Sequence, residues 1–197
     1  MVNLNQGTLA GLAIQAPPRD EQAAIGQAIA DADSSLAQLD QLIAKKHDLK
    51  QAAMQQLLTG RIRLAGFSAP WNAAPLREVA FIRNDKALPT SLPPETLCIE
   101  LEHIGQGTGQ LVGASTAAFS TSAKYRFSRG DVLFGRLRAY LRKHWLADRA
   151  GVCSTEIWPL VGKPGRLASS YLSALVQTDK FSDAAAVSYG THMPRAD

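Results

Sequence analysis

The sequence predicts an α+β protein made of one long helix and a mixed, strand-dominated domain. From Asp20 to about Leu58 the chain has no proline, a single glycine and mostly strong helix formers. From Trp71 onward, short apolar runs alternate with glycine-rich turns, a pattern typical of strands. Of the 197 residues, 46% are hydrophobic and 19% charged. This ordinary globular composition excludes a wholly disordered or fibrous protein.

The residues before the long helix form a short segment of their own. Leu12–Ala16 alternates in a way that predicts one short strand, which needs a sheet to join. Pro17 and Pro18 then separate this segment from the helix.

The long helix carries an apolar seam typical of a coiled coil. Its residues recur at alternating spacings of four and three, at Ile25, Ile29, Ala32, Leu36, Leu39 and Ile43. Lys46 and Lys50 hold the next two positions before Ala53 and Leu57 resume the seam, so we expect the partner surface to change there. At 1.5 Å per residue the helix spans about 58 Å and cannot bury its seam alone. We therefore expect the seam and Leu57 to form a homodimer interface, and Gly60 to end the helix.

The second part of the chain is predicted to hold several strands and one further helix. After a linker at residues 61–70, the domain at residues 71–197 has strands at Leu97–Leu101, Val132–Phe134 and Glu156–Val161. A helix is expected from about Ala168 to Val187.

The basic charge is concentrated in this second part. The net charge of the chain is +4, while residues 1–70 carry six basic and six acidic residues and so sum to zero. Residues 124–149 hold eight Lys and Arg against two Asp, which indicates an anionic partner.

Within this basic stretch, Arg136, Arg138 and Tyr140 alternate with apolar residues. In a strand, these three side chains would lie on one face, and Leu137, Ala139 and Leu141 would pack inward. Aligned cations match a phosphate backbone, and Arg can also bind guanine with two hydrogen bonds. The alternative is an ordinary solvated basic face.

No residue pattern indicates catalysis, a metal site or a cofactor. The four histidines are scattered rather than placed at ligand spacing. Gly105–Gly109 lacks the lysine of a phosphate-binding loop and is interpreted as a plain turn. The sequence has neither a glycine-rich methyltransferase loop nor an Asn/Asp-Pro-Pro-aromatic tetrad. We expect a protein that binds rather than catalyses.

Cys98 and Cys153 are too few and too far apart for a disulfide framework. We expect reduced thiols and a cytoplasmic protein. We find no leader after Met1 and no apolar stretch of the roughly 18 residues that a membrane span needs, so no membrane partner is expected.

Taken together, these segments resemble the specificity subunit of type I restriction-modification systems. The helix is similar to that family's conserved helix at Pro17–Gln22, Leu42–Lys46 and Met54–Gly60. The basic region resembles its target recognition domain at Glu102–Gly105, Gly130–Arg138, Val152–Ile157 and Met193–Asp197.

The resemblance implies a subunit that does no chemistry itself. In that family, two recognition domains each bind one half of a split site in double-stranded DNA, and two long helices hold them at a fixed spacing. Modification subunits supply methyl transfer, and restriction subunits supply translocation and cleavage. The DNA-binding residues that we expect here are Lys124, Arg136, Arg138, Tyr140, Arg142, Lys143, Thr191, His192 and Arg195.

One departure from the family is instructive, because this chain holds one recognition domain and one helix instead of two of each. Met193–Asp197 is ordinarily followed by a short segment and the Pro-Pro start of the next helix, and residues 1–16 look like that continuation. Either the chain is the middle of a full subunit, or it is a half-subunit in which residues 1–16 complete the same recognition domain. We favour the half-subunit.

Two other functions fit the same residues less well. One is a non-specific basic DNA-binding or architectural protein, which would bind all sequences alike and depend steeply on salt. The other is a coiled-coil interaction scaffold whose basic face is incidental.

Overall fold

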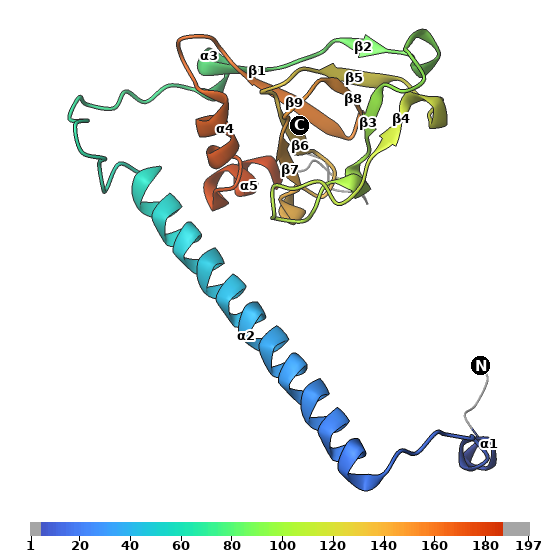
Figure 1. The fold of residues 1–197 in the computed structure, drawn as a ribbon. Helices are drawn as coiled ribbons and strands as arrows, with labels where there is room; N and C mark the ends of the chain where they lie inside the picture. Colours follow the sequence, from blue (N-terminus) through green and yellow to red (C-terminus); the bar gives the residue numbers. More distant parts are fainter. Residues whose placement is uncertain (1–4, 187–197) are drawn as a thin grey trace. The chain divides into compact units, whose positions relative to one another are not determined.

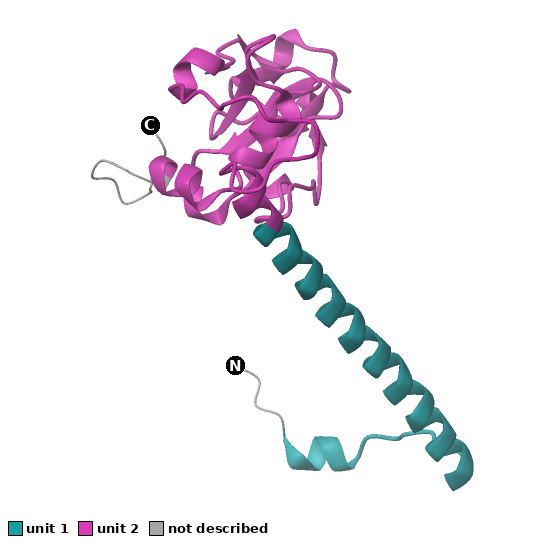
Figure 2. Ribbon diagram, turned by 90° about the vertical axis from the view of Figure 1, so that its left-hand side faces the viewer, with its two compact units in different colours: residues 1–52 teal, residues 53–197 magenta. Residues whose placement is uncertain are grey.

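The computed structural model describes residues 5–186 (Figure 1). The chain divides into two compact units, Met1–Ala52 and Ala53–Asp197 (Figure 2). Among the described residues, no helix is both long and apolar enough to cross a membrane.

The long helix α2 runs without a break from Arg19 to Leu57 and confirms the predicted helix to within one residue at each end (Figure 1). It begins directly after the proline pair, and the carbonyl of Pro18 accepts a hydrogen bond from Gln22 N at 2.9 Å. Gly60 follows the end of the helix with a φ of 71°, a conformation that favours glycine. The predicted glycine stop is therefore confirmed.

The strand predicted at Leu12–Ala16 is wrong. The regular structure before α2 is the short helix α1, Gln6–Ala10, which precedes these residues. Asn5 caps α1, because its side chain accepts a hydrogen bond from Gly7 N at 2.9 Å. Residues 12–18 have no regular structure, and no described strand pairs with them. A strand needs a partner strand for its backbone groups, and among residues 5–186 this segment has none.

The second unit is a mixed domain of short strands and helices, as predicted. Its helices are α3 (Leu76–Val79), α4 (Ser169–Leu175) and α5 (Asp179–Ala186), with 3₁₀ turns η1 (Pro89–Ser91), η2 (Leu101–His103), η3 (Ala117–Phe119) and η4 (Ala139–Leu141). Its strands are β1 (Ala80–Ile82), β2 (Lys86–Ala87), β3 (Leu97–Ile99), β4 (Ser115–Thr116), β5 (Lys124–Phe127), β6 (Val132–Gly135), β7 (His144–Leu146), β8 (Gly151–Cys153) and β9 (Ile157–Gly162).

These strands form two sheets. The four-stranded sheet has the order β1-β9-β6-β7 and is antiparallel throughout. The five-stranded sheet has the order β2-β5-β8-β3-β4, in which only β3 and β8 are parallel. In the four-stranded sheet β6 pairs with β9 from Val132↔Leu160 to Gly135↔Ile157. The end of β6 and the start of β9 therefore lie at the same edge of the sheet.

Strand β6 contributes to both hydrophobic cores because its side chains alternate in direction. Val132 and Phe134 belong to a cluster with Leu172 of α4, and Phe181 of α5 packs against it. Leu133 points into the other cluster, which includes Trp145 of β7 and residues of the five-stranded sheet. All three β6 side chains are fully buried. This strand is the structural centre of the domain.

The single helix predicted at residues 168–187 is two helices. Helix α4 ends at Leu175, and Thr178 Oγ1 donates to the carbonyl of Leu175 at 2.7 Å. The same hydroxyl oxygen accepts a hydrogen bond from Phe181 N at 3.3 Å, in the first turn of α5. Thr178 thus stabilises the break, because a threonine hydroxyl caps a helix start better than it serves a helix interior.

Candidate nucleic-acid interface

The basic segment that the sequence singles out forms the connection between β6 and β7. We call residues 136–143 the basic loop. Gly135 N donates to the carbonyl of Lys143 at 2.9 Å, which closes the loop where the strand pair ends. Arg136 N donates to the carbonyl of Glu156 at 2.9 Å, just before β9. The basic loop therefore lies at one edge of the four-stranded sheet.

The strand predicted over Arg136–Tyr140 is wrong. Arg138 and Arg142 have left-handed backbones, with φ values of 53° and 50°, and they flank the 3₁₀ turn η4. Such values are uncommon outside glycine and turn the chain sharply. Arg136, Arg138 and Tyr140 therefore do not share a strand face. Of the residues expected to pack inward, Ala139 is buried and Leu137 is half-buried.

Three of the predicted DNA-binding side chains hold the basic loop in place. The Arg136 guanidinium lies over the ring of Trp158, 5.1 Å from its centroid. Arg142 Nη2 bonds Asp179 Oδ1 at 2.6 Å, which ties the loop to the start of α5. Lys143 Nζ donates to the carbonyl of Leu101 at 2.8 Å. These contacts fix the loop geometry, although Arg136, Arg142 and Lys143 all stay partly exposed.

Two further residues support the basic loop, and sequence reasoning missed their role. His144 is buried, and its Nδ1 lies 2.9 Å from the carbonyl oxygen of Arg142. Gly109 packs against this ring, because a Cβ at position 109 would lie 2.9 Å from His144 Nε2. Gly109 also has a φ of 72°. The glycine-rich turn predicted at Gly105–Gly109 was the available signal, since close packing and positive φ both require glycine.

Arg138 and Tyr140 point away from the domain. Arg138 is exposed, and Tyr140 is 58% exposed. A guanidinium can bind a phosphate or a guanine edge, and an exposed tyrosine ring can stack or donate a hydrogen bond. The loop thus presents a cation and an aromatic side chain to solvent, while Arg136, Arg142 and Lys143 bind neighbouring elements.

Lys124 occupies a different environment from the basic loop. It lies on β5, its side chain is 5% exposed, and its Nζ bonds Glu100 Oε1 at 2.6 Å. It also donates to Ser122 Oγ at 3.2 Å. The structure therefore gives this lysine a stabilising role inside the domain. The predicted contacts Thr191, His192 and Arg195 lie outside the described residues.

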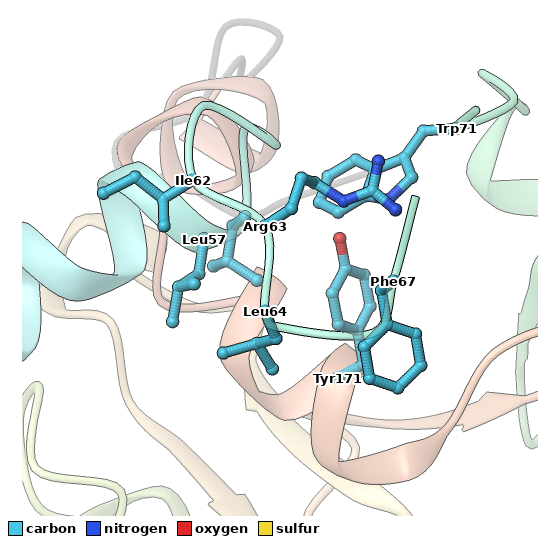
Figure 3. A pocket seen from close by; sticks show the side chains of 8 residues that line it. Leu57, Ile62, Arg63, Leu64, Phe67, Trp71 and Tyr171 are labelled. Atoms are coloured by element: carbon cyan, nitrogen blue, oxygen red, sulfur yellow. The ribbon is translucent and has the colours of Figure 1, made fainter. Parts of the chain in front are cut away.

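The apolar seam of α2 is exposed to solvent in the single chain. The exposed fractions of its large apolar residues run from 46% for Ile25 to 61% for Leu36, with Ile29, Leu39 and Ile43 between them. Ala32 is exposed as well, and α2 has no buried residue. Leu57 instead lines an apolar pocket in the second unit (Figure 3). A helix of this length in water is stabilised chiefly by packing its apolar face, and the seam offers that face to a partner.

The described residues were also compared with the needs of a metal site and of a cysteine nucleophile. In residues 5–186, no group of three or more His, Cys, Asp or Glu side chains could hold a metal ion. Cys98 and Cys153 are free and buried, and burial raises the pKa of both thiols. Such thiols are poor nucleophiles.

No family model matches the chain. The chain is 28% identical over 142 residues to the type I restriction enzyme EcoDI specificity subunit of Escherichia coli. That match covers 71% of this chain and 30% of the relative.

Two solved structures have a similar fold. The HsdS subunit from Thermoanaerobacter tengcongensis matches with a TM-score of 0.55 and 20% identity, over 68% of this chain and 37% of that one. A chain from a structure of a type I R-M system matches with a TM-score of 0.53 and 21% identity, over 65% of this chain and 36% of that one.

These findings confirm the resemblance to type I specificity subunits, and they confirm the α+β class. The chain spans about a third of the length of the relatives that it matches.

The position of Lys124 generates a testable prediction. Lys124→Met should lower the free energy of unfolding by about 1–3 kcal/mol, because it leaves the Glu100 carboxylate without its partner. The loss should stay below the roughly 3–5 kcal/mol of a fully buried pair, since the Glu100 side chain is 30% exposed. Urea unfolding measures the change, with exposed Lys180→Met as the control. Equal stability of the two variants would contradict the structural role.

Proposed function

We propose that this chain is the DNA-specificity component of a type I restriction-modification enzyme and does no chemistry itself. Two copies pair through α2, so that two recognition domains bind the two halves of a split DNA site. The observation that carries the proposal is the exposed seam on an unbroken 39-residue helix, joined in one chain to a domain whose basic loop presents Arg138 and Tyr140 to solvent.

The paired helices set the spacing between the two domains. Because the dimer has two-fold symmetry, its target is two inverted copies of one short half-site with a fixed spacer. The likeness to specificity subunits supports methyltransferase subunits as partners, and restriction subunits through them. The cytoplasm, where these subunits meet DNA, is the proposed location.

The proposed DNA contacts divide into two groups. Arg138 and Tyr140 are the outward residues of the basic loop and are proposed to contact the DNA directly. Arg136, Arg142 and Lys143 hold the loop and add positive potential towards the phosphates. Thr191, His192 and Arg195 stay proposed contacts from the sequence alone.

Pairing through the seam predicts the effect of two charges placed within it. The double variant Leu36→Asp, Leu39→Asp should sediment as a monomer, because the pair would bury four unpaired carboxylates. The same two charges on another face of α2, in Gln38→Asp, Gln41→Asp, should leave the dimer intact. Sedimentation velocity distinguishes the two species. A seam variant that still sediments as a dimer would exclude pairing through this seam.

Direct DNA contact by the basic loop makes a second prediction. Arg138→Ala should weaken binding to a selected duplex by about 1–3 kcal/mol, as expected for loss of a base contact, and should relax specificity at one position. Arg149→Ala is the control, because Arg149 is exposed, bonds the adjacent Asp148 and lies outside the loop. Affinities are compared at one salt concentration, on the selected and a scrambled duplex. Equal affinity for both duplexes in the unsubstituted protein would favour non-specific binding instead.

A further inference from the structure

The glycine-rich turn forms a short hairpin that the proposed DNA contacts do not use. We call residues 104–111 the polar hairpin. Ile104 and Leu111 pair in an isolated antiparallel bridge, and Gly105 N donates to the carbonyl of Gln110 at 2.9 Å. Ile104 is buried in the core cluster that includes residues of the five-stranded sheet, and Leu111 packs against the same cluster. The base of the polar hairpin is therefore anchored in the domain.

Three contacts place the polar hairpin beside the basic loop. Gln106 forms an isolated antiparallel bridge with Lys143, the last residue of that loop. Lys143 Nζ also donates to the carbonyl of Leu101, just before the hairpin, at 2.8 Å. Gly109 packs against the ring of His144, directly after the basic loop. Bridged residues have their Cβ atoms about 4.5–5.5 Å apart, and DNA rises about 3.4 Å per base pair. A duplex that binds one of the two segments therefore extends past the other.

The tip of the polar hairpin is shaped by its own groups. Thr108 Oγ1 accepts a hydrogen bond from Gln110 N at 3.3 Å. A Cβ at position 105 would overlap that same hydroxyl oxygen, so Gly105 permits the close packing. Together with the contact of Gly109 with His144, these roles account for Gly105, Thr108 and Gly109. They do not account for the two glutamine side chains.

The side chains of Gln106 and Gln110 are directed to solvent. Both residues are exposed. In the part of the chain that the structure describes, neither side-chain amide has a hydrogen-bond partner, although the backbone of Gln110 helps to close the hairpin. Each amide thus keeps its donors and its acceptor for a ligand.

The absence of charge in the polar hairpin indicates which part of DNA it suits. From Ile104 to Ala123 the sequence has no Asp, Glu, Lys or Arg. A neutral segment gains little from the charge of the phosphates, and it does not repel them. A glutamine amide does match the edge of adenine, where it binds N6 and N7 with two hydrogen bonds. That edge is displayed in the major groove, which admits a two-stranded ribbon.

We propose that the polar hairpin is a second base-reading element of the recognition domain, in which Gln106 and Gln110 bind adenine edges in the major groove. The inference rests on the proposed DNA binding and adds the class of base. Because Gln106 is bridged to the basic loop, its base lies in the same half-site as the base that Arg138 contacts. The basic loop supplies the positive charge, and the polar hairpin supplies discrimination between bases.

Binding of full-length variants to a duplex selected by the unsubstituted protein tests this assignment. Gln106→Ala and Gln110→Ala should each weaken binding about 5- to 100-fold for each half-site, and each should relax the preference for adenine at one position. The salt dependence of binding should stay unchanged, because a neutral side chain releases no counterions. Gln41→Ala is the matched control, since Gln41 is equally an exposed glutamine but lies on α2, away from the seam.

A second variant distinguishes lost recognition from a folding defect. Gln106→Glu keeps the shape of the side chain but replaces the amide with a carboxylate, which accepts a hydrogen bond from cytosine N4. Selection from a random library should then replace adenine by cytosine at one position and leave the rest of the half-site unchanged. A misfolded domain would lose the whole site instead.

The outcomes separate this inference from the proposed function. Glutamine variants that keep their affinity and their preference at every position would overturn base reading by the polar hairpin, while a loss in Arg138→Ala would leave the proposed DNA specificity standing. An equal loss on the selected and the scrambled duplex would indicate a phosphate contact and would also overturn it. An unsubstituted protein that binds all duplexes alike would overturn both.

Discussion

The structure depends on an apolar seam that its own chain cannot bury. Most of the stability of a helix in a protein comes from packing its apolar face, and none of the α2 residues is buried in the single chain. Burial of the seam residues in a pair would remove several hundred Å² of apolar surface from water, at about 25 cal/mol per Å². The helix is thus both the element most in need of a partner and the element that can separate two domains by a fixed distance.

The domain that follows contacts its basic loop from several elements. Strand β6 is buried on both faces, and the basic loop begins directly after its last residue, Gly135. Asp179 of α5 and Trp158 of β9 contact arginines of the loop, and Gly109, in the turn before β4, packs against the His144 ring directly after it. Rigid support matters for recognition, because a contact to a base edge requires the arginine to be aimed before the DNA arrives.

Local patterns in the sequence predicted the long helix, its glycine stop and strands β6 and β9, because periodicity and breakers act over a few residues. Within the basic segment, the failures depend on distant residues. Arg138 and Arg142 adopt left-handed backbones in a loop held by Asp179, 37 residues after Arg142. Lys124 is buried because Glu100, 24 residues away, meets it across the sheet. Alternation in the sequence cannot reveal such partners.

Selection of bound duplexes from a random library is the most direct test of a paired recognition subunit. The purified dimer should enrich two inverted copies of one short sequence, separated by a spacer of constant length and no preferred bases. Enrichment of a single unrepeated site, of repeats at variable spacing, or of no sequence at all would contradict it.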